Sequence, residues 1–144
     1  TSTAASLNNI GIVLKKKGEY DEALFYYQKA LSIYQQVLGE NHTDTASCYN
    51  NIGLVYDAKG QYDEALVEFF TALAIYIHVL GEFDTDTATC YNNIGGVLYE
   101  RKQYKEALIE LRKAYTIYER VLGKKHSDAV DCFNWIKVVE QQMS

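Results

Sequence analysis

Apolar residues recur every three or four positions along this chain, with polar residues between them, which is the spacing of amphipathic helices. In the first segment, 3–17, the apolar residues Leu7, Ile10 and Leu14 recur three or four positions apart. Residues at this spacing lie on one face of an α-helix, so the segment is predicted to be a helix with one buried side. Gly18 follows it and predicts the helix end.

A second, longer stripe predicts a second helix that continues to about Leu38. Its apolar and aromatic members are Ala23, Leu24, Tyr27, Ala30, Leu31, Tyr34 and Leu38. Asp21 and Glu22 place negative charge in the first turn, where the helix dipole favours it. Gly39 then offers a residue that adopts the left-handed backbone conformation with which many helices end.

This pair of helices recurs with a period of 42 residues. The segment Tyr49-Asn50-Asn51-Ile52-Gly53 returns as residues 91–95 and, more loosely, as residues 7–11. Other markers keep the same interval: Tyr20, Tyr62 and Tyr104; Ala23, Ala65 and Ala107; Tyr34, Tyr76 and Tyr118; Gly39, Gly81 and Gly123. Self-similarity at a fixed interval of this length is typical of stacked repeat proteins, so we expect an all-α fold built from helix pairs.

The repeats predict a single domain over residues 1–144. Its parts are repeat 1 (3–44), repeat 2 (45–86), repeat 3 (87–128) and a capping helix (128–143), which makes about seven helices. In the cap, Phe133 and Ile136 keep the packing side and Lys137 replaces the repeat glycine. Trp135, in a position held by Asn in the repeats, is expected to help this helix dock on repeat 3.

Two details of the turns and connections can be predicted. Lys102 stands where the earlier repeats have Gly18 and Gly60. If that turn requires a positive φ angle, Lys102 is strained by about 1 kcal/mol. In the connection after the first pair, residues 43–45 are expected to cap the next helix with their side-chain oxygens.

Composition narrows the classes of function. The formal net charge is −5 with both signs interspersed, so no basic face for nucleic acid is expected. No apolar run of about 18 residues is present to span a membrane, and 48% hydrophobic residues can fill a core. We expect a cytoplasmic protein, and the start at Thr1 without a Met suggests that the sequence is an excerpt of a longer chain.

The chain offers no convincing catalytic, cofactor or metal site. Cys48, Cys90 and Cys132 occupy the same position of successive copies. Equivalent residues of stacked helices are at least about 8–10 Å apart, too far for a disulfide, so buried thiols in a reducing compartment are expected. The three histidines have no paired nucleophile, and the Gly95-Gly96 pair lacks the Lys-Ser/Thr of a phosphate loop. We therefore expect no enzyme and no cofactor.

These motifs resemble a known family. The tetratricopeptide pattern of an aromatic residue, Leu-Gly, Tyr, Ala and Phe appears as Tyr49-x-x-Ile52-Gly53-x-x-Tyr56 followed by Ala65-x-x-x-Phe69. Its 42-residue period and the segments Asn-Asn-Ile-Gly, Tyr-Asp-Glu-Ala-Leu and Val-Leu-Gly-Glu-Asn-His are similar to the repeats of kinesin light chains and nephrocystin-3-like proteins. The proline that usually precedes each first helix in kinesin light chains is absent here. The resemblance implies a right-handed α-solenoid of tetratricopeptide repeats.

The resemblance also implies a function. Members of this family bind peptides or short helices in the concave groove that the first helices of the pairs line, as cargo adaptors or scaffolds. The residues expected to face this groove are Asn8, Ile12, Lys15, Lys16, Asn50, Leu54, Asp57, Asn92, Gly96, Tyr99 and Glu100. Asn8, Asn50 and Asn92 form a ladder that can hold a peptide main chain or, alternatively, bridge neighbouring repeats.

Several alternatives remain open for these residues. The neighbouring Asn9, Asn51 and Asn93 are expected to tie repeats together. Gly96 stands where repeats 1 and 2 have Ile12 and Leu54, so it either opens a pocket beside Leu54 or only weakens its helix by about 1 kcal/mol. Tetratricopeptide domains that bind chaperone tails hold the terminal carboxylate of the ligand with a Lys and an Asn. In this chain the same two positions are Asn8 and Ile12, so that carboxylate-binding pair is absent.

The partner expected from this pattern is a protein or peptide, with neither nucleic acid nor membrane. A different hypothesis is structural: repeat 1 has no helix before it, and its uncapped face could associate end to end with another copy. A third is that the chain is the sensor or interaction part of a larger signalling protein.

Overall fold

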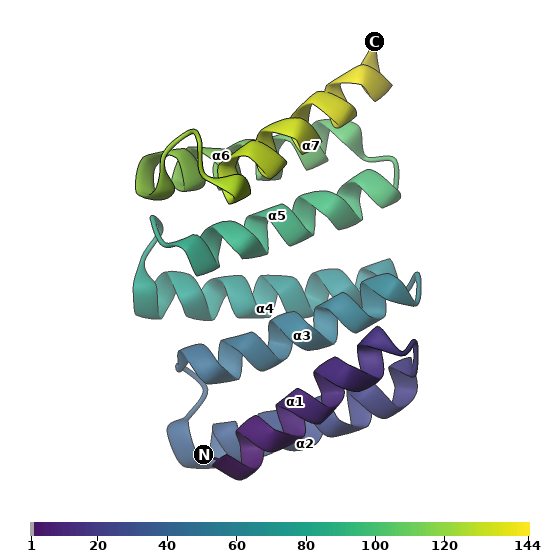
Figure 1. Ribbon diagram of the computed structural model, residues 1–144, viewed down its shortest axis with the longest axis vertical. Coiled ribbons are helices and arrows are strands. Elements are labelled where there is room, and N and C mark those ends of the chain that lie inside the picture. The colour runs from purple at the N-terminus through teal and green to yellow at the C-terminus, as the bar shows by residue number, and fades with distance from the viewer. Residues whose placement is uncertain (1) are drawn as a thin grey trace. The chain divides into compact units, whose positions relative to one another are not determined.

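The computed structural model describes residues 2–144, and every regular element in this range is an α-helix (Figure 1). The helices are α1 (Ser2–Lys16), α2 (Tyr20–Leu38), α3 (Thr43–Ala58), α4 (Tyr62–Leu80), α5 (Thr85–Glu100), α6 (Tyr104–Leu122) and α7 (Ser127–Met143). The all-α fold of paired helices is confirmed. We call α1, α3, α5 and α7 the A helices and α2, α4 and α6 the B helices. None of these described helices has the length and apolar character needed to cross a bilayer.

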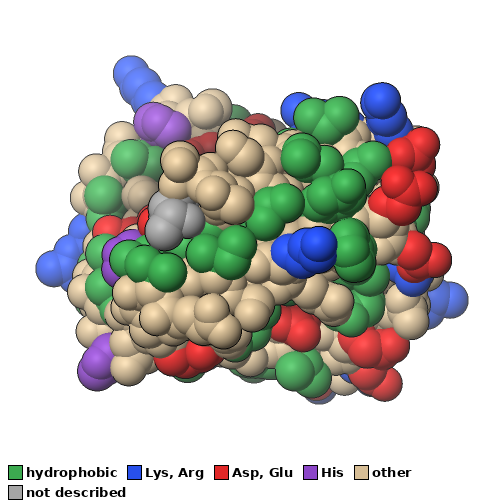
Figure 2. Space-filling model, turned by 90° about the horizontal axis from the view of Figure 1, so that it is seen from below, with side chains coloured by type: hydrophobic (Ala, Val, Ile, Leu, Met, Phe, Trp, Pro, Cys, Tyr) green, Lys and Arg blue, Asp and Glu red, His purple; other side chains and the backbone are tan. Residues whose placement is uncertain are grey.

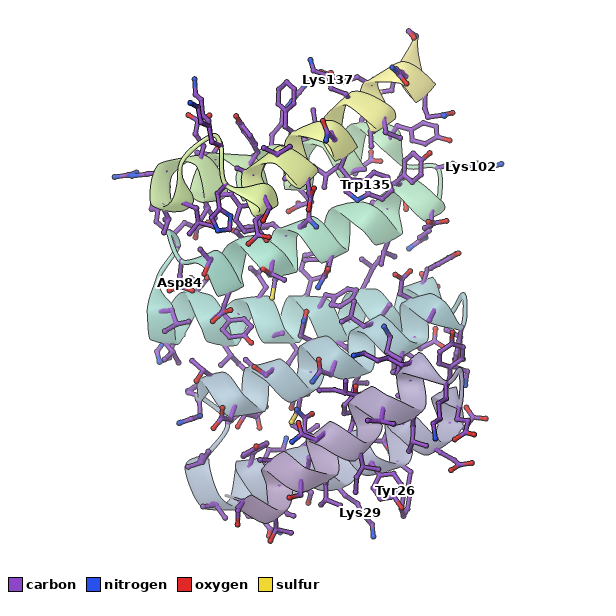
Figure 3. All side chains as sticks on the ribbon, in the orientation of Figure 1. Tyr26, Lys29, Asp84, Lys102, Trp135 and Lys137 are labelled. Carbon is purple, nitrogen blue, oxygen red and sulfur yellow. The ribbon has the colours of Figure 1, made fainter. Side chains whose placement is uncertain are left out.

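The B helices start and stop at equivalent residues because the same turn residues recur. Each ends before a glycine in the left-handed region, with φ of +85° at Gly39, +90° at Gly81 and +91° at Gly123. The turns inside the pairs also need positive φ, which Gly18 and Gly60 adopt at +79° and +76°. The third pair uses Lys102 there, at φ +63° (labelled in Figure 3). The condition under which strain was expected at Lys102, a positive φ, is therefore met.

The starts of the A helices correct one prediction. The side chain of His42, not a residue of 43–45, caps α3, because its Nδ1 accepts a hydrogen bond from the Asp44 N–H at 3.0 Å. Asp84 and His126 cap α5 and α7 in the same way. The Thr45 hydroxyl instead donates to the Gly39 carbonyl oxygen at 2.9 Å, and so fastens the start of α3 to the end of α2.

A glycine of each A helix lets the B helix of the same pair approach closely. A Cβ atom at Gly11 would lie 2.7 Å from the ring of Tyr27, and one at Gly53 would lie 2.7 Å from the ring of Phe69. Gly95 has the same relation to the side chain of Leu111. Real Cβ contacts are essentially never so short, so these glycines are required by packing. The constant spacing between the glycine and the large residue therefore determines how closely the two helices of a pair pack.

The helices form two compact units, one that ends at Val79 and a second over Leu80–Ser144. In the first unit, α2 contributes Ala23 and Tyr27 to a core cluster with Ile52 and Val55 of α3. A second cluster joins α1, α2 and α3: Ala4, Ala30, Tyr34 and Cys48. In the second unit, α6 passes behind α7 in Figure 1. Its Ala107, Leu111 and Ala114 are fully buried.

Buried thiols were expected at the repeated cysteine positions, and this prediction is confirmed. Cys48, Cys90 and Cys132 are free and buried. Burial raises the pKa of each thiol to about 12 from an ordinary value of 9.0, because the charged thiolate loses its hydration. Such thiols are inert at neutral pH.

Polar side chains tie the connection before an A helix to that helix. The Tyr49 hydroxyl donates to Glu40 at 2.5 Å, and the Tyr91 hydroxyl donates to Glu82 at 2.6 Å. Burial, and then the bond to Glu40, raise the pKa of Tyr49 to about 12. The equivalent pair at the start of α7 is Phe133 and Lys124, which cannot form this bond.

Candidate functional site

The predicted groove residues lie on A helices in both units. The first unit holds Asn8, Ile12, Lys15, Lys16, Asn50, Leu54 and Asp57, and the second holds Asn92, Gly96, Tyr99 and Glu100. All are half-buried except Lys16 and Glu100, which are exposed. The side chains in this set are therefore reachable from solvent and partly fixed by packing.

In the first unit, one asparagine of the predicted ladder, Asn8, bridges neighbouring repeats, as the alternative interpretation predicted. Asn51 Nδ2 donates a hydrogen bond to Asn8 Oδ1 at 3.1 Å, which joins α3 to α1. Ile12 packs against the core cluster that contains Tyr27 and Ile52. Both Asn8 and Ile12 thus take part in holding the repeats together, whatever else they contact.

In the second unit, three predicted residues follow one another along one face of α5. Asn92, Gly96 and Tyr99 are four and three positions apart, the spacing of a single helical stripe. Asn92 Oδ1 is buried and has no hydrogen-bond partner among residues 2–144. A Cβ atom at Gly96 would meet no atom within 4 Å, so the helix surface is open there.

The stripe ends at a hollow between α5 and α7. This hollow has a volume of about 470 Å³ and is lined by Tyr99, Asp131, Asn134, Trp135 and Val138. The rings of Tyr99 and Trp135 meet edge to face, with centroids 5.1 Å apart and planes 66° apart. The side chain of Trp135 points from α7 toward α5 in Figure 3.

Of these five lining residues, only Tyr99 was predicted as a site residue. Trp135 was predicted to dock α7, and no role was predicted for Asp131, Asn134 or Val138. The signal was present for two of them, since Asn134 and Val138 lie 42 residues after Asn92 and Gly96. The stripe of α5 therefore has an equivalent on α7 that extending the repeat period would have revealed.

Charge at the hollow comes from one residue. Among the five lining residues only Asp131 is formally charged, and neither it nor Asn134 has a side-chain hydrogen bond or an ion pair within residues 2–144. The nearby Lys137 is held by Glu140, with Nζ and Oε1 3.4 Å apart, and its Nζ lies 5.0 Å from the centre of the Phe133 ring. In the described part of the chain, no three His, Cys, Asp or Glu side chains are grouped so as to hold a metal ion.

Comparison with known proteins identifies the fold. The model of a tetratricopeptide repeat family matches residues 2–76, and a second tetratricopeptide repeat model matches residues 87–128. No curated protein sequence matches this chain significantly.

Solved structures with the same fold include repeat proteins from several organisms. A putative kinesin light chain from Podosopora anserina, with nearly identical TPR-like repeats, is 18% identical with a TM-score of 0.84 over 95% of this chain and 65% of that one. BtubC (BKLC) from P. vanneervenii is also 18% identical, with a TM-score of 0.79 over 97% of this chain and 64% of that one.

A third structure matches over almost the whole length of both chains. The TPR2B domain of yeast Sti1, in its complex with pHsp70, is 18% identical with a TM-score of 0.76, covering 99% of each chain. The first two matches show that this chain spans just under two thirds of those structures. The two family models together cover most of the helices described above, and the chain belongs to the tetratricopeptide repeat family.

Proposed function

We propose that this chain is a non-catalytic interaction module that binds a peptide or helical segment of a partner protein on its A-helix faces, as a cargo-adaptor or scaffold domain. One observation carries the proposal. On α5, a buried amide oxygen without a partner, an open surface at Gly96 and an aromatic ring lie along one stripe that ends in a hollow. The open surface and the hollow leave room for a ligand, and the half-buried Asn92 amide beside them can hydrogen-bond to it.

The physical roles of the stripe differ along its length. Asparagine side chains offer a donor and an acceptor, so Asn50 and Asn92 can hold the main chain of a peptide independently of its sequence. The open surface at Gly96 takes a ligand side chain where repeat 2 has Leu54. The TPR2B domain of yeast Sti1 was solved as a complex with pHsp70, which supports a partner-binding role for this fold.

The proposal is tested by selecting a peptide from a display library against the whole chain and then measuring its affinity for a double variant. Asn50→Ala with Gly96→Leu removes one main-chain contact and fills the open surface. We expect the affinity to fall at least about tenfold, the size of one or two lost contacts, while Tm changes by only a few degrees.

A matched control is available on the B helices. Val67 and Ile109 are 63% and 54% exposed and occupy equivalent positions of α4 and α6. Replacing both with Ala should leave peptide affinity unchanged. Equal affinity of the wild type and the Asn50→Ala, Gly96→Leu variant would refute the assignment of the A-helix faces.

A second candidate function is self-association through the front of α1. Ile10 and Val13 are 43% and 51% exposed, whereas their equivalents Ile52 and Val55 in α3 are 2% and 0% exposed. The α3 pair is covered by Ala23 and Tyr27 of the preceding B helix. Figure 2 looks at this end of the first unit and shows hydrophobic side chains gathered across it. We infer that α1 presents a surface suited to another helix.

A further inference from the structure

The capping helix α7 departs from the repeat at one position with a structural consequence. Asn51 of α3 donates to Asn8 of α1, but the position equivalent to Asn51 in α7 is Trp135. In the second unit, the equivalent acceptor, Asn92 Oδ1, therefore has no donor and stays buried without a partner. The indole of Trp135 turns toward Tyr99 instead, so an amide bridge between A helices is replaced by an aromatic pair.

This aromatic pair is built into a wider cluster but keeps an accessible face. Tyr99 also meets Tyr104, with ring centroids 5.7 Å apart, which fixes the orientation of the Tyr99 ring. Trp135 is 36% exposed and borders the hollow of about 470 Å³. Two rings in an edge-to-face arrangement present an electron-rich surface, to which a cation is attracted.

The polar groups at the hollow point to the same kind of occupant. Asp131 carries the only formal charge among the lining residues and has no cationic partner in residues 2–144, while Lys137 is engaged with Glu140. A carboxylate beside a cation forms a charge-assisted hydrogen bond, which is stronger than a neutral one. A purely apolar side chain would instead take water from Asp131 without replacing its hydrogen bonds, which is costly.

We propose that this hollow binds the positively charged side chain, Arg or Lys, of a peptide partner. The cation lies against the rings of Tyr99 and Trp135 and pairs with Asp131, and the Asn134 amide contacts the adjoining peptide main chain. The proposal rests on the proposed function because the cation is carried by the peptide that the A-helix faces bind. The hollow at the end of the α5 stripe would then prefer a positively charged side chain of that peptide.

The test uses small probes, so it does not depend on a selected peptide. The chain has a single tryptophan, and its fluorescence therefore reports on the hollow alone. The probes are N-acetyl-arginine amide, N-acetyl-lysine amide and, as a neutral analogue of similar shape, N-acetyl-citrulline amide. We expect both cations to change the fluorescence in a saturable way, and citrulline to need about tenfold more for the same change, the combined effect of ring and carboxylate.

Two variants separate a specific site from general attraction to an acidic protein. Asp131→Asn keeps the shape of the hollow and should abolish the difference between arginine and citrulline amides. Asp128→Asn removes the same charge from the same helix, one turn away and outside the lining of the hollow, and should keep the difference. Equal responses to arginine and citrulline amides in the wild type, or equal effects of the two variants, would overturn the proposal.

Failure here is distinguishable from failure of the proposed function. If a display-selected peptide binds the A-helix faces but the cation preference is absent, only the assignment of the hollow is wrong. If the cation preference is present but no peptide can be selected, the hollow stands as a site for a cationic group and the wider peptide-binding role is refuted.

Discussion

Lys102 is the residue where one side chain opposes the local backbone. Within residues 2–144 it is the only residue other than glycine with a positive φ. In this conformation the Cβ atom approaches the backbone, a cost that glycine avoids. The third turn therefore keeps the shape of the other two, with Gly18 and Gly60, at an energetic disadvantage.

Replacing Lys102 with Gly should stabilise the chain by about 1 kcal/mol, since the strain is removed and the turn is unchanged. Urea unfolding followed by circular dichroism measures the difference. Lys102→Ala is the matched control, because it removes the charge and the long side chain but keeps the Cβ atom. If Ala stabilises as much as Gly, the strain is not the cause.

Buried thiols predict how stability depends on pH. The pKa of each thiol is raised from 9.0 to about 12 in the folded chain. Above about pH 9 the unfolded chain loses these protons while the folded chain keeps them, so deprotonation stabilises the unfolded chain. The free energy of unfolding should be insensitive to the thiols below pH 9 and should fall as pH rises toward 12.

Urea unfolding at about pH 8 and about pH 10.5 measures this fall. A variant with Ala at positions 48, 90 and 132 should lose less stability between the two conditions. The remaining fall reflects tyrosines such as Tyr27, whose pKa burial raises to about 12. An equal fall in the variant would show that the thiols do not contribute.

At the scale of single residues, the sequence predicted positions better than partners. The positive φ of Lys102 followed from its alignment with Gly18 and Gly60, because backbone geometry repeats when the fold repeats. The capping role of His42 was missed because Thr43 and Asp44 are commoner caps and stand beside it. Asp131 was missed because the hollow that it lines exists only once α7 is packed.

At the scale of the helices, the glycines inside the A helices differ in whether a side chain of another helix contacts them. Gly53 lies against the ring of Phe69, while Gly96 faces open space, although both sit inside A helices. The same substitution should therefore have opposite effects at the two positions. This difference could not be predicted from the sequence alone, where both glycines interrupt a helical pattern.

Gly53→Ala should destabilise the chain by about 1–3 kcal/mol, because the new methyl group forces Phe69 to move. Gly96→Ala should stabilise it by up to about 1 kcal/mol, because Ala has the higher helix propensity and meets no atom. The midpoints of urea unfolding measure both stability changes, provided that the slope of the unfolding free energy against urea concentration is unchanged. Combining Gly53→Ala with Phe69→Leu should show non-additive energies, and shifts in the same direction for both single variants would contradict the packing argument.

At the scale of the whole molecule, the front of α1, meaning the exposed face with Ile10 and Val13, determines how two copies can associate. In the second unit, Ile136 and Val139 of α7, the equivalents of Ile10 and Val13, are 7% and 0% exposed. The B-helix surface of α6 that would receive a second copy is thus already covered by α7. Association through α1 is therefore expected to pair two front faces, which gives a closed dimer and not a filament.

Light scattering over a wide concentration range tests this association. The wild type should approach the mass of a dimer at high concentration, whereas Ile10→Glu with Val13→Glu should stay monomeric because charge is placed on the contact. Val67→Glu with Ile109→Glu, at exposed B-helix positions, is the control and should still dimerise. A strict monomer at every concentration would refute this second candidate function.

The pairing of each glycine with a large residue has a consequence for how such a chain can change in length. Gly11 and Tyr27, Gly53 and Phe69, and Gly95 and Leu111 each lie within a single 42-residue copy. Duplication or loss of one entire copy therefore separates no glycine from the side chain it accommodates. Genetic exchange in whole copies preserves these contacts, whereas a cut inside a copy breaks one of them.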